Sequence, residues 1–179
     1  MVFAVVLIVI GVLSIIGWKN VFRWFIPSKR HVKCIKKAAQ VKDLLTSGIF
    51  SPGQAINYLR KINPYVFEEL VLTGFEERGY KIIRNKRYSG DGGMDGMVIR
   101  NGEEFLVQSK RYTGYISNAH VEAFSRLCTR RCRKGFFVHT GKTGGKSKDV
   151  VSYFGNVDII SGDRLLALIG FQQINDYES

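Results

Sequence analysis

The sequence predicts an α/β fold in which helices flank a mixed central sheet, preceded by one transmembrane helix. Three observations lead to this fold class. Segments of helix and strand character follow residue 63 in the order α-β-β-β-α-β-α-β. Asn101-Gly102 is a hairpin turn signal between two of the strands. An uncharged apolar run of 18 residues, MVFAVVLIVIGVLSIIGW, stands at positions 1–18.

The apolar run at positions 1–18 is long enough for about 27 Å of helix, which just spans a bilayer. It has neither the basic start nor the A-x-A site of a signal peptide, and Trp18, Trp24 and Phe25 suit an interfacial belt. A buried core helix is the alternative. No acid precedes Asp43, and the basic residues before it include Lys19, Arg23, Lys29, Arg30, Lys33, Lys36 and Lys37.

By the positive-inside rule, this charge pattern predicts a single-pass protein of the inner (cytoplasmic) membrane with the remaining chain in the cytoplasm. Residues 2–18 would contact the membrane, and residues 19–37 would contact anionic lipid.

Two helices are predicted between the membrane segment and the globular part. One covers residues 31–48 and ends at Gly48, and the second begins at Ser51-Pro52. We expect them to form a stalk or hairpin. The predicted organisation is a transmembrane helix (1–18), a basic juxtamembrane segment and helical stalk (19–62), a globular domain (63–172) and a tail (173–179).

The globular domain opens with a helix capped by Asn63, started by Pro64 and ending near Gly79. Strands are predicted at 80–88 and, around the turn, within 94–112. An amphipathic helix at 117–132 follows, then a buried strand at 135–140. A helix at 147–154, a strand at 156–161 and a last helix at 162–171 complete the domain.

The net charge of +12 and pI near 9.8 favour a polyanionic partner, either nucleic acid or an anionic membrane. The three cysteines form no disulfide framework. Cys128, Cys132 and His139 match no usual zinc spacing.

Two neighbouring acids on the first domain helix have different predicted environments. On a helical wheel Glu68 lies about 60° from the centre of the apolar face, whereas Glu69 lies about 160° away. Glu69 is therefore expected in solvent. Glu68 is expected at the edge of the core, where it needs either a salt bridge or a metal ion.

Strand alternation places Gln108 and Lys110 on one side of a strand, with Ser109 on the other. Asp95 begins the neighbouring strand, so these polar groups and Glu68 can converge. Carboxylate and amide oxygens suit Mg²⁺. The glycines at 90, 92, 93 and 96 are expected to permit positive φ angles in a tight turn that Asp91 shapes.

At these residues the sequence resembles the Mrr family of restriction endonucleases in the PD-(D/E)xK nuclease superfamily. The stretches that carry the resemblance are FEEL, ERGY, GDGGMDG, VQSKRY and DIISGDRLLALI, in this order between residues 63 and 170. The resemblance implies a restriction-endonuclease-like fold and Mg²⁺-dependent hydrolysis of DNA phosphodiester bonds, often in modified foreign DNA.

The resemblance also implies residue roles. Asp95 is the metal-binding acid, Gln108 stands where many nucleases have glutamate, Lys110 is the catalytic lysine and Glu68 matches the helix acid. One or two Mg²⁺ ions would be held by Asp95, Gln108, Glu68 and a backbone carbonyl near Ser109. The alternative is a non-catalytic, membrane-tethered DNA-binding protein with a nuclease-like fold, and a homodimer is compatible with either.

Several basic residues are candidates for contacting duplex DNA. The loop 141–148 does not fit a phosphate-binding ATPase motif, because Gly141 lies one place late, so its lysines are expected either to touch DNA phosphates or to be solvated. The arginines near residue 130 either track phosphates or favour a helix C-terminus. The predicted DNA-binding residues are Lys86, Arg87, Arg111, Arg130, Arg131, Lys142, Lys146 and Lys148.

Overall fold

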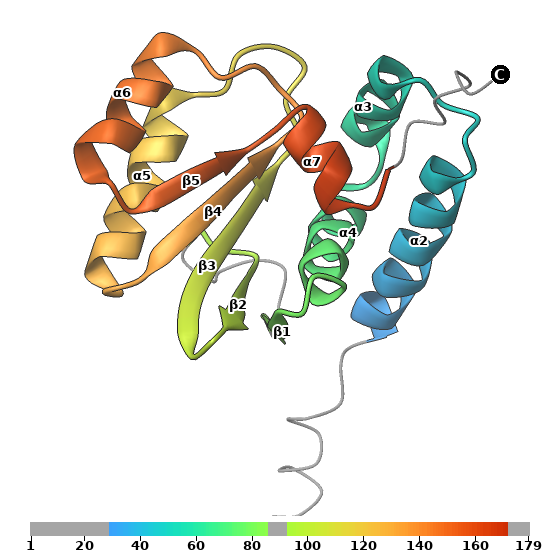
Figure 1. The fold of residues 1–179 in the computed structure, drawn as a ribbon, viewed down its shortest axis with the longest axis horizontal. Coiled ribbons are helices and arrows are strands. Elements are labelled where there is room, and N and C mark those ends of the chain that lie inside the picture. The colour runs from blue at the N-terminus through green and yellow to red at the C-terminus, as the bar shows by residue number, and fades with distance from the viewer. Residues whose placement is uncertain (1–28, 86–92, 172–179) are drawn as a thin grey trace, which may run out of the picture. The chain divides into compact units, whose positions relative to one another are not determined.

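The structure is a computed structural model that describes residues 29–85 and 93–171. The chain divides into compact units of residues 1–33 and 34–179. Its elements are α2 (Lys29–Thr46), α3 (Pro52–Lys61), α4 (Pro64–Glu76), β1 (Lys81–Arg84), β2 (Gly96–Arg100), β3 (Glu103–Lys110), α5 (Asn118–Arg130), β4 (Lys134–His139), α6 (Gly145–Phe154), β5 (Val157–Ile160) and α7 (Asp163–Leu168) (Figure 1). The predicted α/β class and element order from residue 63 are confirmed.

The five strands form one mixed sheet in the order β1-β2-β3-β4-β5. β1, β2 and β3 are antiparallel, while β3, β4 and β5 are parallel. Asn101 and Gly102 connect β2 to β3 with φ angles of 53° and 79°, as the Asn-Gly signal predicts. Because β3 pairs with neighbours on both sides, its carboxyl end lies in the middle of the sheet.

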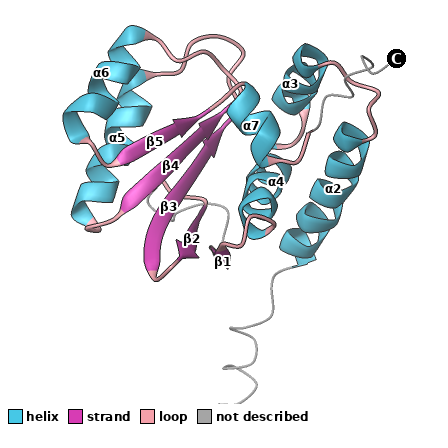
Figure 2. Ribbon diagram, in the orientation of Figure 1, coloured by secondary structure: helices cyan, strands magenta, loops and turns pink. Residues whose placement is uncertain are grey.

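Helices cover both faces of the sheet (Figure 2). Side chains alternate along β3, so Val107 packs into the core shared with α4, while Leu106 packs into the core shared with α5. The two cores are otherwise built from different helices. Odd-numbered residues of β3 therefore face the layer that contains α4, and even-numbered residues face the layer that contains α5.

The helices α2 and α3 pack against the globular part. Val41 and Leu45 of α2 and Leu59 of α3 belong to the same apolar cluster as Phe67 of α4. α3 begins with the predicted cap, which is a full capping box between Ser51 and Gln54. The stretch from residue 34 to 62, expected as a stalk, therefore contributes to the core.

The predicted membrane-spanning run at 1–18 lies outside the described residues. Among the residues that are described, no helix is both long enough and apolar enough to span a membrane.

Glu69 contradicts its prediction as a solvent residue. Its side chain is 1% exposed, and its carboxylate accepts a hydrogen bond from Nε of Arg84 in β1 at 2.8 Å. The helical wheel failed because it assumes one buried face. α4 is covered by the sheet on one side and by α7 and the core residues of α2 and α3 on others, so buried positions run almost continuously from Val66 to Phe75.

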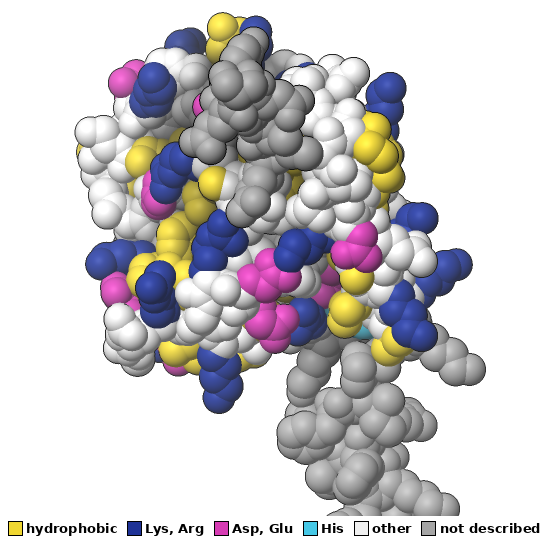
Figure 3. All heavy atoms as spheres, turned by 45° about the vertical axis from the view of Figure 1, so that its right-hand side comes forward, with side chains coloured by type: hydrophobic (Ala, Val, Ile, Leu, Met, Phe, Trp, Pro, Cys, Tyr) yellow, Lys and Arg dark blue, Asp and Glu magenta, His cyan; other side chains and the backbone are white. Residues whose placement is uncertain are grey.

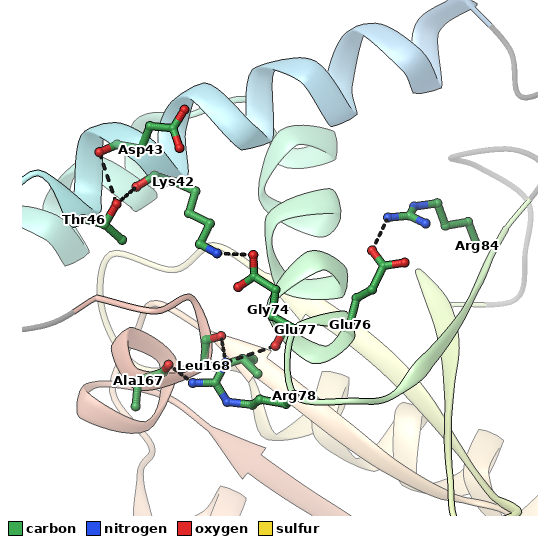
Figure 4. A network of polar contacts seen from close by, with 10 residues as sticks. All are labelled: Lys42, Asp43, Thr46, Gly74, Glu76, Glu77, Arg78, Arg84, Ala167 and Leu168. Atoms are coloured by element: carbon green, nitrogen blue, oxygen red, sulfur yellow. Dashed lines mark hydrogen bonds and ion pairs between the residues drawn. The ribbon is translucent and has the colours of Figure 1, made fainter.

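The carboxyl end of α4 is tied to several elements (Figure 4). Arg78 donates hydrogen bonds to the carbonyl oxygens of Gly74, Ala167 and Leu168, and so caps α7. A Cβ at Gly74 would collide with the Leu168 backbone, so this close approach of α4 and α7 requires glycine. Lys42 of α2 pairs with Glu77, and Arg84 also reaches Glu76.

Glu69→Gln tests whether the pair with Arg84 holds α4 onto β1. We expect a loss of about 1.5–3 kcal/mol in the free energy of unfolding, because a buried charge-assisted hydrogen bond is removed. Chemical denaturation of both proteins measures it. The control is Glu122→Gln, which breaks the exposed Glu122–Arg126 pair and should cost no more than about 0.5 kcal/mol. Equal effects of the two substitutions would contradict the role assigned to Glu69.

Candidate active site at the carboxyl end of β3

Asp95 stands directly before β2 and is fixed against β3. Its backbone N–H donates to the carbonyl oxygen of Val107 at 2.8 Å. Its carboxylate Oδ2 accepts from the Ser109 backbone N–H at 2.5 Å and from Ser109 Oγ at 2.7 Å. These two hydrogen bonds to Oδ2 fix the orientation of the Asp95 carboxylate, and Oδ1 remains an acceptor for another partner.

Gln108 and Lys110 lie on the same side of β3, as alternation predicts. Both line a pocket of about 120 Å³ between the strand and α5. Gln108 is buried, and its side-chain amide donates to the carbonyl oxygen of Gly93. This bond uses the NH₂ group, so the amide oxygen remains an acceptor. Lys110 is half-buried at the end of the strand.

Glu68 of α4 is half-buried and interacts electrostatically with Asp95 and Lys110. Burial raises the pKa of Glu68 to about 8, and repulsion from Asp95 and Glu69 adds to the rise, while Lys110 and Arg111 oppose it. Burial also raises the pKa of Asp95, although the bonds from Ser109 and the charge of Lys110 oppose this. Asp95, Glu68 and Lys110 thus share one electrostatic environment.

The donors at this site fit a hard divalent cation. Two carboxyl groups that repel each other in a desolvated place are stabilised by a cation beside them. The Gln108 amide oxygen is a neutral candidate ligand on the α5 side of β3. In the part of the chain that is described, no cluster of three or more His, Cys, Asp or Glu side chains could hold a metal. The metal-binding set proposed here therefore depends on Gln108 as well as on two acids.

The family of Mrr catalytic domains, described as restriction endonuclease, matches residues 59–169, which is more than half of the chain. The chain belongs to the Mrr-type restriction endonuclease family. This membership confirms the resemblance seen in the sequence and implies DNA endonuclease activity.

A comparison with curated proteins gives no match. Among solved structures, SfsA of Pyrococcus furiosus in complex with Ca²⁺ is similar over 59% of this chain, with 16% identity and a TM-score of 0.36. The match covers 56% of that chain.

The glycines of this Mrr-type site have different roles. Gly93 has a φ of 92°, and it brings its carbonyl oxygen to Gln108, so the predicted positive φ is confirmed here. Gly96 begins β2 without a positive φ. A Cβ there would lie 3.1 Å from Leu72 and 3.2 Å from the Ile83 carbonyl oxygen, so its small size lets α4 approach the sheet. Gly90, Asp91 and Gly92 lie outside the described residues.

Three predicted DNA-binding lysines of the Mrr domain lie at the same end of the sheet as the site. Lys142, Lys146 and Lys148 are exposed in the connection from β4 into the first turn of α6. This connection is joined to the segment after β3 by hydrogen bonds between Lys142 and residues Gly114 and Ile116. On the face in Figure 3 the basic side chains are scattered, with acidic ones between some of them.

Other predicted DNA-binding residues are placed differently. Lys86 and Arg87 lie outside the described residues. Arg111 donates to the carbonyl oxygens of Arg60 and Ile62, so its guanidinium caps α3. Arg130 and Arg131 are exposed at the far end of α5, beside the start of β4, which is the opposite end of the sheet. Nothing in the sequence alone distinguishes these arginines from the lysines near the site.

His139 serves the fold at the end of β4. Its Nδ1 accepts from the Gly141 backbone N–H at 3.1 Å, and its Nε2 faces the Thr143 hydroxyl at 3.1 Å. Burial lowers the pKa of His139 to about 4.

Cys128 is buried while Cys132 is exposed, so the weak zinc pattern of the sequence gains no geometric support.

No pattern in the sequence predicts two of the contributors to this region. Strand alternation places the Ser109 side chain opposite Gln108 but does not predict that Ser109 provides both donors to Asp95. Tyr112 and His120 meet at 2.5 Å beside the pocket. The connection between β3 and α5 brings Tyr112 and His120 together, so the spacing of sequence motifs does not predict this contact.

Glu68→Gln should change how stability depends on pH. The unfolded chain has the ordinary pKa of 4.5 for this group, whereas the folded value is about 8. Between these values the folded state holds a proton that the unfolded state has lost, so wild-type stability falls as pH rises through this window. In metal-free buffer we expect the melting temperature of Glu68→Gln to fall less over that range.

The control for this measurement is Asp43→Asn, which removes an exposed carboxylate and should retain the wild-type pH dependence. Parallel curves for wild type and Glu68→Gln would rule out the raised pKa.

Proposed function

We propose that this chain is a Mg²⁺-dependent DNA endonuclease of Mrr type, anchored in the inner membrane by residues 2–18 and acting on the cytoplasmic side. The observation that carries the proposal is the fixed carboxylate of Asp95, which interacts electrostatically with Glu68 and Lys110 at the centre of the sheet. All three residues lie within the stretch 59–169 that matches the Mrr family. Foreign or modified DNA is the proposed substrate.

Each residue has a proposed task. Asp95, Glu68 and the amide oxygen of Gln108 would hold one or two Mg²⁺ ions, which when bound supply charge stabilisation and acidify a water molecule. Ser109 holds the Asp95 carboxylate in direction and opposes the rise of its pKa through two hydrogen bonds. Lys110 would orient the attacking water and stabilise charge on the phosphate oxygens.

The alternative is a membrane-tethered DNA-binding protein that has kept the nuclease fold without catalysis. The observation that favours it is the neutral Gln108, which leaves two acids at the site. Cleavage of plasmid DNA with and without Mg²⁺ separates the two proposals, because binding alone would leave the plasmid intact under both conditions.

DNA is proposed to approach the end of the sheet where the site lies. Eight of the 27 basic residues precede the first acid, so the other 19 are matched by 15 acids and leave a surplus of four. This surplus is modest, so the position of the charges matters more than their number. Lys142, Lys146 and Lys148 are exposed at this end.

Asp95→Ala and Lys110→Ala should each abolish or strongly reduce Mg²⁺-dependent cleavage of plasmid DNA while the protein stays folded. Asp95→Ala should also lose the stabilisation that Mg²⁺ gives in thermal unfolding, since it removes the best-fixed metal ligand. Lys110→Ala should keep that stabilisation and slow single-turnover cleavage by about 10²- to 10³-fold. Wild-type cleavage by Asp95→Ala would overturn the site assignment.

The triple substitution Lys142→Ala, Lys146→Ala and Lys148→Ala should weaken binding of duplex DNA and flatten its salt dependence. Each lost phosphate contact lowers the slope of log K against log salt by about one. Titration of the full chain with labelled duplex over a range of salt concentrations measures the slope. The matched control is Arg130→Ala with Arg131→Ala, at the opposite end of the sheet. A larger effect in this control would place the DNA on the other end.

Carbonate washing of membranes tests the proposed anchor. The uncharged run at 1–18 and the basic residues after it predict that the chain stays in the membrane pellet. Release by carbonate would show peripheral binding, in which anionic lipid holds residues 19–37 without a spanning helix. Full recovery in the soluble fraction before washing would exclude both modes of membrane contact.

A further inference from the structure

A tyrosine and a histidine form a hydrogen-bonded pair beside the proposed active site. The hydroxyl of Tyr112 lies 2.5 Å from Nδ1 of His120, which is in the first turn of α5. His120 lines the same pocket as Gln108, Lys110 and Gly93. His120 is exposed at this pocket, so its ring can be reached from outside.

Tyr112 is held rigidly from the side of β4. Its backbone N–H donates to the Thr140 hydroxyl at 2.9 Å, and that hydroxyl donates to the Tyr112 carbonyl oxygen at 2.9 Å. The Thr140 carbonyl oxygen in turn accepts from Arg60 at 2.9 and 3.1 Å. The Tyr112 ring also packs edge-on against the buried ring of His139, with centroids 6.3 Å apart. The phenol is therefore a fixed support for His120.

One direction of this hydrogen bond fixes the form of the histidine ring. The hydroxyl of Tyr112 can donate its proton to Nδ1 of His120. Burial raises the pKa of Tyr112, which keeps that proton in place. When the hydroxyl donates to Nδ1 of His120, the ring proton is carried on Nε2. Nε2 is then a donor at the mouth of the pocket.

We propose that His120 is a further catalytic residue of this nuclease, donating a hydrogen bond from Nε2 to an oxygen of the phosphate that is cleaved. Tyr112 is its positioning residue, because it holds Nδ1 and so fixes both the ring and its protonated nitrogen. This inference rests on the proposed function. Lys110 would contact the same phosphate from the strand, and His120 would contact it from the helix across the pocket.

Substitutions of His120 can separate this role from a structural one. The side-chain amide nitrogen of glutamine can reach the place of Nε2, whereas the shorter asparagine reaches only the place of Nδ1. With the full chain, plasmid DNA and Mg²⁺, single-turnover cleavage should fall about 10²-fold in His120→Ala and His120→Asn. His120→Gln should recover much of this loss, and Tyr112→Phe should lie between wild type and His120→Ala.

Binding and stability complete the test. With Ca²⁺ in place of Mg²⁺, affinity for duplex DNA should change by less than about threefold, because the contact acts on the chemical step. The melting temperature of His120→Ala should stay near that of wild type. The control is Asn118→Ala, an exposed residue in the same helical turn that does not line the pocket, and it should cleave as wild type does.

The outcomes also distinguish this inference from the function on which it rests. If wild type cleaves, Asp95→Ala does not, and His120→Ala cleaves at the wild-type rate, the role of His120 alone is overturned. Equal loss in His120→Gln and His120→Ala, together with a lower melting temperature, also overturns it in favour of a structural role. If wild type fails to cleave with Mg²⁺, the proposed function and this inference are both overturned.

Discussion

The carboxyl end of β3 buries consecutive polar side chains in the middle of a sheet that helices cover on both faces. Buried polar groups must be hydrogen-bonded, because each one left without a partner costs free energy. Gln108 is satisfied by the Gly93 carbonyl oxygen, and Ser109 by the Asp95 carboxylate. Both partners come from the segment just before β2. The hydrogen bonds that these polar side chains of β3 require therefore also position Asp95. The site is thus a consequence of how the central strand ends.

Alternation along β3 then distributes the polar groups between two layers. Gln108 and Lys110 point toward α5 and share its pocket with His120. Ser109 has the same parity as Val107, which packs with α4, the helix that carries Glu68. The proposed catalytic groups therefore surround the end of one strand and come from both of its sides. A substrate phosphate bound there would meet donors from β3 and α5 together with the acids.

Local rules predicted much of this arrangement from sequence, and tertiary packing decided the rest. Ser51, Asn63 and the Asn101-Gly102 turn mark their elements correctly, because caps and turns depend on nearby atoms. The strand alternation placed Gln108 and Lys110 together for the same reason. The wheel failed for Glu69 because α4 is buried on several sides, which one helix cannot reveal. The engagement of Arg111 with α3 and the meeting of Tyr112 with His120 likewise depend on how elements pack.

Glu68 and Glu69 are adjacent in one helix but have opposite electrostatic environments. Glu69 is more deeply buried, yet Arg84 compensates its charge at 2.8 Å. Glu68 lies near a second carboxyl group, and its pKa is raised to about 8. An acid whose charged form is disfavoured lowers stability near neutral pH unless a ligand compensates it. Arg84 pairs with Gly96, the residue after Asp95, in the β1–β2 ladder. The Glu69–Arg84 pair therefore anchors α4 over β2, which begins directly after Asp95, and this anchor holds Glu68 at the site.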